Sequence, residues 1–163
     1  MAQTIYIMKN KGVYVMVKTM VILMGIQGSG KSTFYATQLS NDYVRVNLDT
    51  LKTRYQEGLL IDKCFNEEKS FAVDNTNPTK EVRAKYINLA KANGYRVIGY
   101  FMQSRIKDCI KRNALREGKA RVPEKAIIAT SNKLEMPSFE EGFDELYFVM
   151  NDDSNITIKE WKD

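Results

Sequence analysis

The sequence predicts one α/β domain in which a parallel sheet carries helices on both faces. Its 163 residues, 44% of them hydrophobic, have the size of one domain and suffice for a substantial core. From residue 20 onward, short apolar runs alternate with longer segments that can form helices. A glycine-rich stretch connects the first apolar run to the first helical segment. Strands and helices that alternate in this way assemble into parallel sheets with both faces covered.

The first strand, the glycine-rich loop and the first helix form the most specific pattern in the chain. Residues 20–24 are an almost continuous apolar run, as in a buried parallel strand. The loop Gly25–Ser32 reads G-x-x-x-x-G-K-S, in which backbone N–H groups surround phosphates, Lys31 reaches the β/γ oxygens and Ser32 can bind Mg²⁺. A helix can start at Lys31 and run to Leu39. This arrangement predicts a nucleoside triphosphate site. The plainer interpretation is a glycine-rich turn without a ligand.

The remaining elements are predicted from apolar runs, glycines and prolines. Gly58, Gly94 and Gly118 are expected to end helices, and Asn77 followed by Pro78 is expected to begin one. The predicted strands are 43–47, 71–73, 95–102 and 145–149, and the predicted helices are 50–57, 61–69, 78–93, 105–117 and 122–136. Inward-facing positions are expected at Val82, Tyr86, Leu89, Ile106, Cys109 and Ile110.

Residues 1–19 are predicted to be an extension outside this domain, which comprises residues 20–163. The extension forms either a β-hairpin that turns at Lys9–Gly12 or a loosely held segment. Lys18 interrupts its hydrophobic residues, and the chain has no run of about 20 apolar residues, so we predict no membrane span. With only two cysteines in the chain, we expect a protein of the reducing cytoplasm.

Composition narrows the possible chemistry. The chain contains no histidine, which excludes histidine acid/base chemistry, Ser-His triads and the common zinc sites, so any general base is a carboxylate or a lysine. The net charge of +5 lies between Arg105 and Lys125, where eight basic residues accompany three acidic ones. Such a segment favours contact with a polyanion or a triphosphate, whereas a solvated helix face is the plainer interpretation. Within it, Arg112 and Arg116 are four apart and are expected on one helix face.

Two carboxylates are expected at the same sheet edge as the loop. Asp49 follows the second predicted strand and Asp74 the third, and ligands bind at the carboxyl ends of parallel strands. Asp49 could take a proton from an attacking hydroxyl, or it could be an ordinary helix N-cap. Asp74 could order Mg²⁺, or it could form an Asx turn with Asn75. With Lys31 and an arginine that neutralises charge, these groups suffice for phosphoryl transfer.

The order of five segments resembles the 5′-kinase domain of polynucleotide kinases from bacteriophage and from animal repair enzymes. The resemblance covers about residues 20–150. The segments are G-I-Q-G-S-G-K-S-T at 25–33, N-L-D-T-L at 47–51, D-N-T-N-P at 74–78, K-R-N at 111–113 with Arg116, and F-E-E-G-F at 139–143. The resemblance implies a single P-loop kinase domain with an adenylate-kinase-like fold. It also implies transfer of the γ-phosphate of ATP to the 5′-hydroxyl of DNA or RNA.

The resemblance further implies a role for each matching position. Asp49 is implied as the general base, with Lys31 and Arg116 as the other catalytic groups. The implied ATP site comprises Gly25, Gly28, Ser29, Gly30, Lys31, Ser32, Thr33, Arg112 and Arg116, with Ser32 and Asp74 for Mg²⁺. The implied acceptor site comprises Asp49, Lys52, Arg54, Asn75, Thr76 and Asn77.

Two positions depart from the family pattern. Leu48 stands where family members usually carry arginine, and Lys52 stands where the bacteriophage form carries another. Lysine offers a point charge in place of a two-point phosphate clamp, so we expect weaker acceptor binding or reliance on Arg54. The phosphatase domain of those enzymes has no counterpart in this sequence, which predicts a stand-alone kinase.

Two alternatives stay open. The first is a kinase of the same fold that acts on a nucleoside, a sugar or an antibiotic, whose binding to oligonucleotides would respond little to salt. The second is a nucleotide-binding regulator without acceptor chemistry. In that case Asp49→Asn leaves function unchanged, and Lys31→Ala abolishes it.

Overall fold

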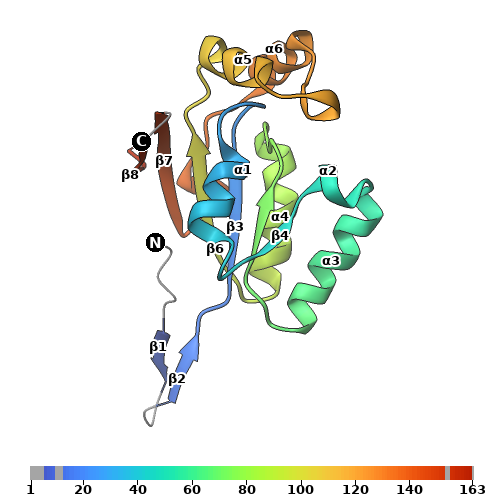
Figure 1. Cartoon of the computed structure of the whole chain (residues 1–163). Helices are drawn as coiled ribbons and strands as arrows, with labels where there is room; N and C mark the ends of the chain where they lie inside the picture. Colours follow the sequence, from blue (N-terminus) through green and yellow to red (C-terminus); the bar gives the residue numbers. More distant parts are fainter. Residues whose placement is uncertain (1–5, 10–12, 153–154, 163) are drawn as a thin grey trace.

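The computed structural model describes residues 6–9, 13–152 and 155–162. Its centre is a six-stranded sheet in the order β4-β5-β3-β6-β7-β8 (Figure 1). All of these strands except β8 run parallel, which confirms the predicted sheet. Two strands outside this sheet, β1 and β2, pair antiparallel with each other, and residues 10–12 of the predicted turn lie outside the described residues. The strands are β1 (Tyr6–Lys9), β2 (Val13–Met16), β3 (Thr19–Met24), β4 (Val44–Val46), β5 (Phe71–Asp74), β6 (Arg96–Met102), β7 (Glu145–Asp152) and β8 (Asn155–Glu160).

Strand β8 forms an antiparallel edge that the sequence pattern does not predict. It pairs with β7 from Tyr147 opposite Glu160 to Asp152 opposite Asn155. Its residues are exposed apart from Ile156, which is half-buried. Its only signal is the short alternation of Ile156 and Ile158 with polar residues, which is too brief to predict a strand by itself.

Helices cover both faces of the sheet, as the sequence predicts (Figure 1). On one face, α3 and α4 pack on a core that contains Ile22 and Phe71. On the other face, α1 and η1 pack on a core that contains Val21 and Tyr100. The helices are α1 (Lys31–Phe34), its π-helical continuation η1 (Tyr35–Leu39), α2 (Leu48–Leu51), α3 (Arg54–Asn66), α4 (Lys80–Ala92), α5 (Ile106–Ala114), η2 (Gly118–Ala120), α6 (Glu124–Lys133) and η3 (Phe139–Glu141).

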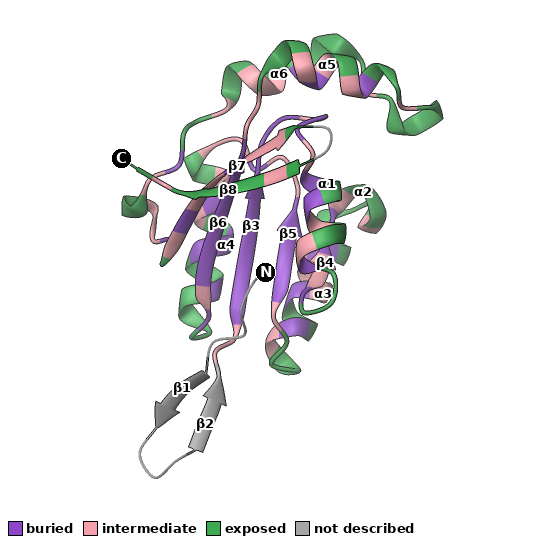
Figure 2. Ribbon diagram, turned by 60° about the vertical axis from the view of Figure 1, so that its left-hand side comes forward, coloured by how far each residue is buried: buried purple, intermediate pink, exposed green. Residues whose placement is uncertain are grey.

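Strand β3 lies in the interior of the sheet, and all of its residues are buried (Figure 2). Its neighbours are β5 and β6, so the loop that follows it leaves from the interior of the carboxyl edge. Helices α5 and α6 lie beyond this edge, where Ile26, Cys109 and Ile127 form a third, small core (Figure 1). None of the helices in the described part of the chain is long and apolar enough to cross a membrane.

The segment between β4 and β5 differs from the prediction. Instead of one helix that ends at Gly58 and a second one after it, the chain forms the single turn α2 and the long helix α3, which continues through Gly58. Lys52 has a φ of 70° and separates the two helices, and the Thr53 side chain caps α3. A glycine inside a helix costs about 1 kcal/mol relative to alanine. Burial of Ile61 and Cys64 against the core outweighs that cost.

Helix α4 begins later than the sequence predicts. Thr79 caps it, not Asn77, because the Thr79 side chain accepts a hydrogen bond from the first turn. The predicted apolar stripe is also partly wrong, since Leu89 is 49% exposed whereas Arg83 is fully buried. Arg83 can occupy that position because its Nε lies 2.7 Å from a carboxylate oxygen of Glu141. A local apolar pattern cannot reveal so distant a partner.

Helix α5 ends before Arg116, so Arg112 and Arg116 do not share a helix face as predicted. The buried side chain of Asn113 hydrogen-bonds both the N–H and the carbonyl oxygen of Val122, at 2.9 and 2.7 Å. These two bonds turn the chain back toward α6. Ile106, which is predicted to face inward, is 37% exposed at the start of the helix.

Candidate active site

The loop Gly25–Ser32 connects β3 to α1 at the carboxyl edge of the sheet. Gly28 and Gly30 have φ values of 81° and 96°, in the left-handed region that favours glycine. A Cβ at Gly28 would lie 2.4 Å from the carbonyl oxygen of Cys109 in α5, and one at Gly30 would lie 2.3 Å from Nδ2 of Asn151 in β7. The loop is therefore enclosed by α5 and β7, with no room for a side chain at these two glycines.

Lys31 is buried within this loop. Its Nζ donates to two carbonyl oxygens of the loop at 2.8 and 2.9 Å. Burial lowers the pKa of Lys31 to about 8, against the raising effect of Asp74 and, more weakly, of Asp49, while Arg116 lowers it further. Charges influence a pKa in this way only over short distances. The structure thus brings Asp49, Asp74 and Arg116 to the same site as Lys31.

The hydroxyl of Ser29 in the loop is buried and could donate a hydrogen bond to a ligand. Ser29 Oγ is buried and makes no hydrogen bond with any residue that the structure describes. A buried hydroxyl without a partner costs about 1–3 kcal/mol. A phosphate oxygen would satisfy it, so Ser29, Lys31 and the backbone N–H groups of the glycine-rich loop fit the phosphates of a nucleotide.

Ser32 and Asp74, the residues predicted to hold Mg²⁺, are neighbours. Ser32 Oγ lies 3.5 Å from Oδ2 of Asp74, which is the last residue of β5 and is 2% exposed. Arg45 Nε donates to the same carboxylate oxygen at 2.9 Å, so this side chain pairs with β4 instead of forming the alternative Asx turn. A carboxylate and a hydroxyl are oxygen ligands of the type that Mg²⁺ takes alongside phosphate oxygens. These two residues therefore fit the ion. The sequence pattern does not predict Arg45 as a site residue.

Asp49 lies in the first turn of α2 and is exposed. The N-cap of α2 is Asn47, whose Oδ1 accepts a hydrogen bond from Thr50 N at 3.1 Å and whose Nδ2 donates to the carbonyl oxygen of Asp74 at 2.5 Å. The interpretation of Asp49 as a helix N-cap is therefore wrong. Because Asn47 caps the helix, the carboxylate of Asp49 stays accessible to a substrate.

A network of polar side chains ties α2 to β5 and α4. Asn75 Oδ1 accepts from Leu48 N at 2.9 Å, and its Nδ2 donates to Glu57 at 2.7 Å. Glu57 is 4% exposed and also accepts from the Tyr86 hydroxyl at 3.0 Å and from Arg54 Nη1 at 2.7 Å. Burial, reinforced by the charge of Glu57, raises the pKa of Tyr86 to about 12, so the hydroxyl keeps its proton at neutral pH.

This network changes one assignment made from the sequence and adds two residues to the surroundings of the site. Arg54, which the resemblance places on the acceptor side, instead pairs with Glu57 and with the Tyr86 hydroxyl. Glu57 and Tyr86 adjoin the site without being predicted there. Their only sequence signal is the spacing of Arg54 and Glu57, three residues apart in a helix, which is too common to indicate a site.

The other residues assigned to the acceptor side occupy different kinds of position. Asn77 has a φ of 44° and is 1% exposed, and its Nδ2 donates to the Leu23 carbonyl oxygen at 2.7 Å. It therefore supports the end of β3 and, because it is buried, does not offer its side chain to an acceptor. Thr76 is half-buried and Lys52 is exposed, and the Lys52 ammonium donates to the backbone oxygen of Asp49. Both remain predicted contacts of the acceptor.

Arg112 contacts the loop from α5. Its Nη1 donates to the Gly28 carbonyl oxygen at 2.9 Å and its Nη2 to the Asn151 carbonyl oxygen at 3.2 Å. The side chain thus links the loop to the end of β7. A direct contact between Arg112 and a nucleotide remains a prediction, as does the role of Arg116, which follows α5 and is half-buried.

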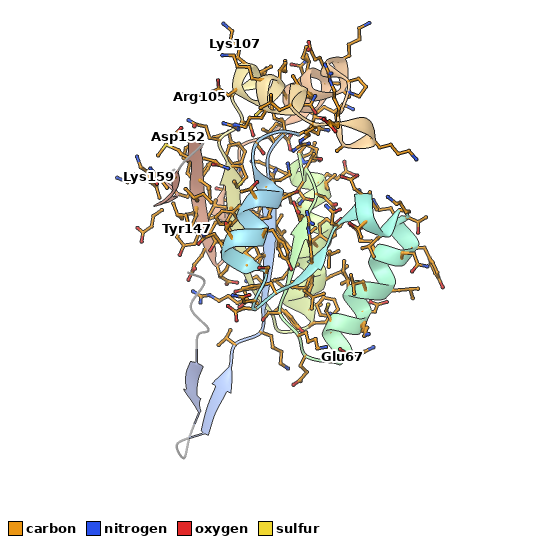
Figure 3. The ribbon with its side chains drawn as sticks, in the orientation of Figure 1. Glu67, Arg105, Lys107, Tyr147, Asp152 and Lys159 are labelled. Carbon is orange, nitrogen blue, oxygen red and sulfur yellow. The ribbon has the colours of Figure 1, made fainter. Side chains whose placement is uncertain are left out.

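The basic segment extends over α5, η2 and α6, beyond the sheet edge that carries the loop (Figure 1). Arg105 and Lys107 lie at the outer side of this layer (Figure 3). The exposed basic residues of the segment are Arg105, Lys107, Lys111, Lys119, Arg121 and Lys125. The segment therefore offers positive charge to solvent next to the candidate site.

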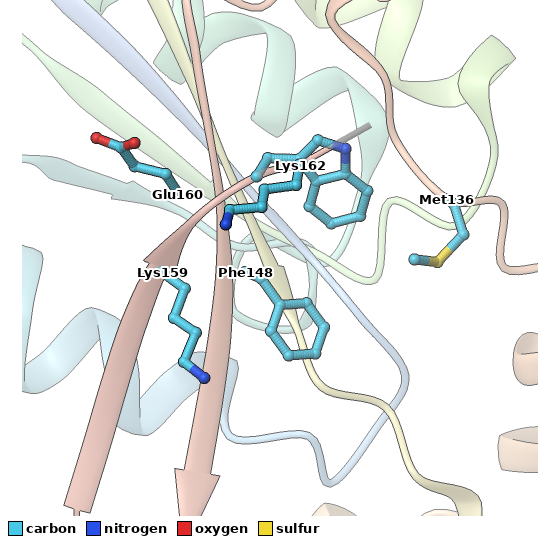
Figure 4. A pocket seen from close by; sticks show the side chains of 6 residues that line it. Met136, Phe148, Lys159, Glu160 and Lys162 are labelled. Carbon is cyan, nitrogen blue, oxygen red and sulfur yellow. The ribbon is translucent and has the colours of Figure 1, made fainter.

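A pocket of about 640 Å³ lies at the β8 end of the sheet (Figure 4). The Trp161 ring packs edge-on against Phe101 with ring centroids 5.7 Å apart. The pocket is lined by Met136, Phe148, Lys159, Glu160, Trp161 and Lys162. None of the residues predicted for catalysis or binding lines it, so this pocket is separate from the candidate active site.

Comparisons with known proteins give relatives for most of the chain. A family model described as an AAA domain matches residues 20–137. The chain is 34% identical over 127 residues to the bifunctional polynucleotide phosphatase/kinase of Schizosaccharomyces pombe, a match that covers 76% of this chain and 31% of that protein. It is 32% identical over 154 residues to a protein of Acanthamoeba polyphaga mimivirus named "Putative bifunctional polynucleotide phosphatase/kinase", covering 89% of this chain and 37% of that protein. The chain thus spans about a third of the length of these relatives.

A solved structure shares the fold. The structure of Chaetomium thermophilum Kti12 in complex with ADP-AlF3 matches with a TM-score of 0.59 at 14% sequence identity. The match covers 82% of this chain and 90% of that one. The likeness extends over most of the described α/β domain.

Proposed function

This chain belongs to the AAA domain family, and on that premise we propose that it transfers the γ-phosphate of ATP to the 5′-hydroxyl of DNA or RNA ends. The observation that carries the proposal is the attachment of α2, which carries the accessible carboxylate of Asp49, to the end of β5 at the sheet edge of the loop. The names of the two curated relatives, both polynucleotide phosphatase/kinases, support a nucleic acid end as the acceptor. As the sequence predicts, we place this activity in the cytoplasm.

The loop would provide the donor side of the reaction. Lys31 would exchange the two loop carbonyl oxygens for oxygens of the β- and γ-phosphates, and Ser29 would donate its unused hydroxyl hydrogen to a phosphate. Ser32 and Asp74 would hold Mg²⁺, which supplies positive charge against the phosphates when it is bound. Arg116, which influences Lys31, would neutralise charge on the phosphoryl group during transfer.

Asp49 would provide the acceptor side. The chain has no histidine and Lys31 would bind phosphate, so we assign the role of base to the accessible carboxylate of Asp49. Asp49 would accept the proton of the 5′-hydroxyl while that oxygen bonds to the γ-phosphorus and the bond from the phosphorus to the β–γ bridging oxygen breaks. The exposed basic residues of α5, η2 and α6 would contact the phosphates of the acceptor strand, with an affinity that falls as salt rises.

Label transfer from γ-labelled ATP to oligonucleotides tests this proposal. With Mg²⁺, we expect the protein to label 5′-hydroxyl DNA or RNA and not the same strands carrying a 5′-phosphate. Asp49→Asn should lower turnover by about 10²- to 10⁴-fold with the dissociation constant of ATP nearly unchanged. Lys85→Gln, which removes an exposed charge on α4, is the matched control and should keep normal turnover.

Three results would count against the proposal. Absence of label on DNA and RNA ends of every structure would contradict it. Transfer to a nucleoside or a sugar, without transfer to oligonucleotides, would favour a small-metabolite kinase instead. Near-normal turnover of Asp49→Asn would remove Asp49 from the mechanism.

A further inference from the structure

A cationic side chain of the protein lies between the two residues that fit Mg²⁺. Arg45 Nη2 is 2.5 Å from Asp74 Oδ2 and 3.0 Å from Ser32 Oγ. Its Nε is 2.9 Å from the same carboxylate oxygen. One guanidinium therefore contacts both groups, which are themselves only 3.5 Å apart.

The surroundings of Arg45 allow the guanidinium to leave this position. Its side chain is 36% exposed, whereas that of Asp74 is 1% exposed, so it approaches the buried carboxylate from the solvent side. Its guanidinium carbon already lies 5.2 Å from the centroid of the Tyr35 ring, so part of the stabilisation of the cation does not depend on Asp74. Arg45 could therefore move away from Asp74 without unpacking the core.

We propose that Arg45 takes the place of the divalent cation in the nucleotide-free protein and competes with it for Asp74 and Ser32. A buried carboxylate without a counter-charge is strongly unfavourable, and Arg45 provides that charge. A metal ion bound to the same oxygens would repel the guanidinium and displace it toward solvent. The inference rests on the proposed function, because it assumes that a metal–nucleotide complex binds at this loop.

The competition has a measurable consequence. Metal binding must break the contacts of Arg45, so the ion binds more weakly than Asp74 and Ser32 alone would allow. The phosphates of a nucleotide add further ligands to the ion and shift the balance in its favour. The site should therefore hold the ion only together with a nucleotide, and removal of the guanidinium should strengthen the binding of the ion in that complex.

The test is the factor by which Mg²⁺ tightens the binding of ADP, measured by titration calorimetry in EDTA and at one fixed Mg²⁺ concentration that fills the nucleotide complex but not the free protein. For Arg45→Gln we expect this factor to be about three- to tenfold larger than for the wild type. Arg45→Lys keeps the charge without the two-point contact, and its factor should lie between them. The control Lys85→Gln, which removes a charge from the exposed side of α4, should match the wild type.

A second measurement uses the wild-type protein and does not depend on the folding of a variant. In an isotope-labelled sample, the Arg45 Nε–H signal in the NMR spectrum should exchange slowly with water in the free protein. Addition of Mg²⁺ and ADP should shift this signal and speed its exchange.

Each contrary result overturns the inference. The inference fails if the tightening of ADP binding by Mg²⁺ is unchanged or smaller in Arg45→Gln, or if Lys85→Gln increases this tightening equally. It fails as well if Mg²⁺ and ADP leave the Arg45 Nε–H signal unchanged. It also fails if Mg²⁺ does not tighten ADP binding to the wild type. Absence of label transfer to oligonucleotides, in contrast, contradicts the proposed function and leaves the calorimetric comparison as a valid test of Arg45.

Discussion

At neutral pH the side chain of Lys31 is protonated, although its burial disfavours the charged form. Burial lowers its pKa from 10.5 to about 8, so the folded protein releases this proton more readily than the unfolded chain does. The protonated lysine therefore destabilises the fold below about pH 8. This penalty fades as the pH rises from about 8 toward 10.5, where the unfolded chain loses the proton as well.

The lowered pKa predicts that nucleotide binding takes up a proton. Phosphate oxygens beside Lys31 Nζ would raise its pKa again, so near pH 8 the binding of ADP should add up to about half a proton to this group. The measurement is the binding enthalpy at pH 8 in buffers of different ionisation enthalpy, whose slope gives the proton uptake. At about pH 6.5 Lys31 is already charged and its contribution should disappear. An enthalpy at pH 8 that does not depend on the buffer would contradict the prediction.

At the scale of elements, the short helix α2 matters most because it carries Asp49. A single turn has little stability of its own, so its position depends on contacts with its neighbours. Asn47 bonds to the carbonyl oxygen of Asp74, and Asn75 accepts from Leu48 N. These bonds attach α2 to the end of β5 and thereby fix the proposed base, Asp49, relative to the proposed metal ligand, Asp74.

Loss of one of these attachments should impair catalysis more than nucleotide binding. We expect Asn75→Ala to lower turnover roughly tenfold, because Leu48 N loses its acceptor and Glu57 loses a donor. The affinity for ATP, measured separately by calorimetry, should change little. Gln56→Ala, on the exposed side of α3, is the control. Equal turnover of the two variants would show that Asn75 does not position α2.

The same elements show how far the sequence can be interpreted. Strand β3, the loop and α1 could be predicted because their signals are contiguous and the phosphate-binding pattern has few other uses. The boundary between α2 and α3 could not, because the positive φ of Lys52 and the cap at Thr53 decide it while Gly58 is tolerated. Arg45 could not be predicted as a site residue either, because its partner Asp74 lies 29 residues away in the sequence and meets it only when β4 pairs with β5.

At the scale of the whole molecule, one buried ion pair joins distant parts of the chain. Arg83 in α4 is fully buried and pairs with Glu141 in η3 at 2.7 Å. Its Nη1 also donates to the carbonyl oxygens of Asn77, Pro78 and Glu135. Arg83 thus connects the segment before β7, which includes η3, to the residues that follow β5. No local pattern predicts this burial, since the two charges are 58 residues apart.

Breaking this pair should destabilise the whole domain. Arg83→Met leaves the Glu141 carboxylate buried without its partner, and we expect the free energy of unfolding to fall by about 3–5 kcal/mol. The double variant Arg83→Met/Glu141→Leu removes both charges and should recover part of the loss. Urea unfolding followed by circular dichroism measures both effects. A single variant as stable as the wild type would show that the pair contributes little.

The enclosure of the loop by α5 and β7 also affects how a ligand is received. Gly28 lies against the Cys109 carbonyl, Gly30 lies against Asn151, and Arg112 joins the two sides. The chain therefore loses the conformational entropy of the loop when it folds, before any nucleotide arrives. Because the loop is already ordered, little of the free energy of its contacts with a nucleotide is spent on ordering it, and more contributes to affinity. The rate of association is then limited by diffusion and not by ordering of the loop.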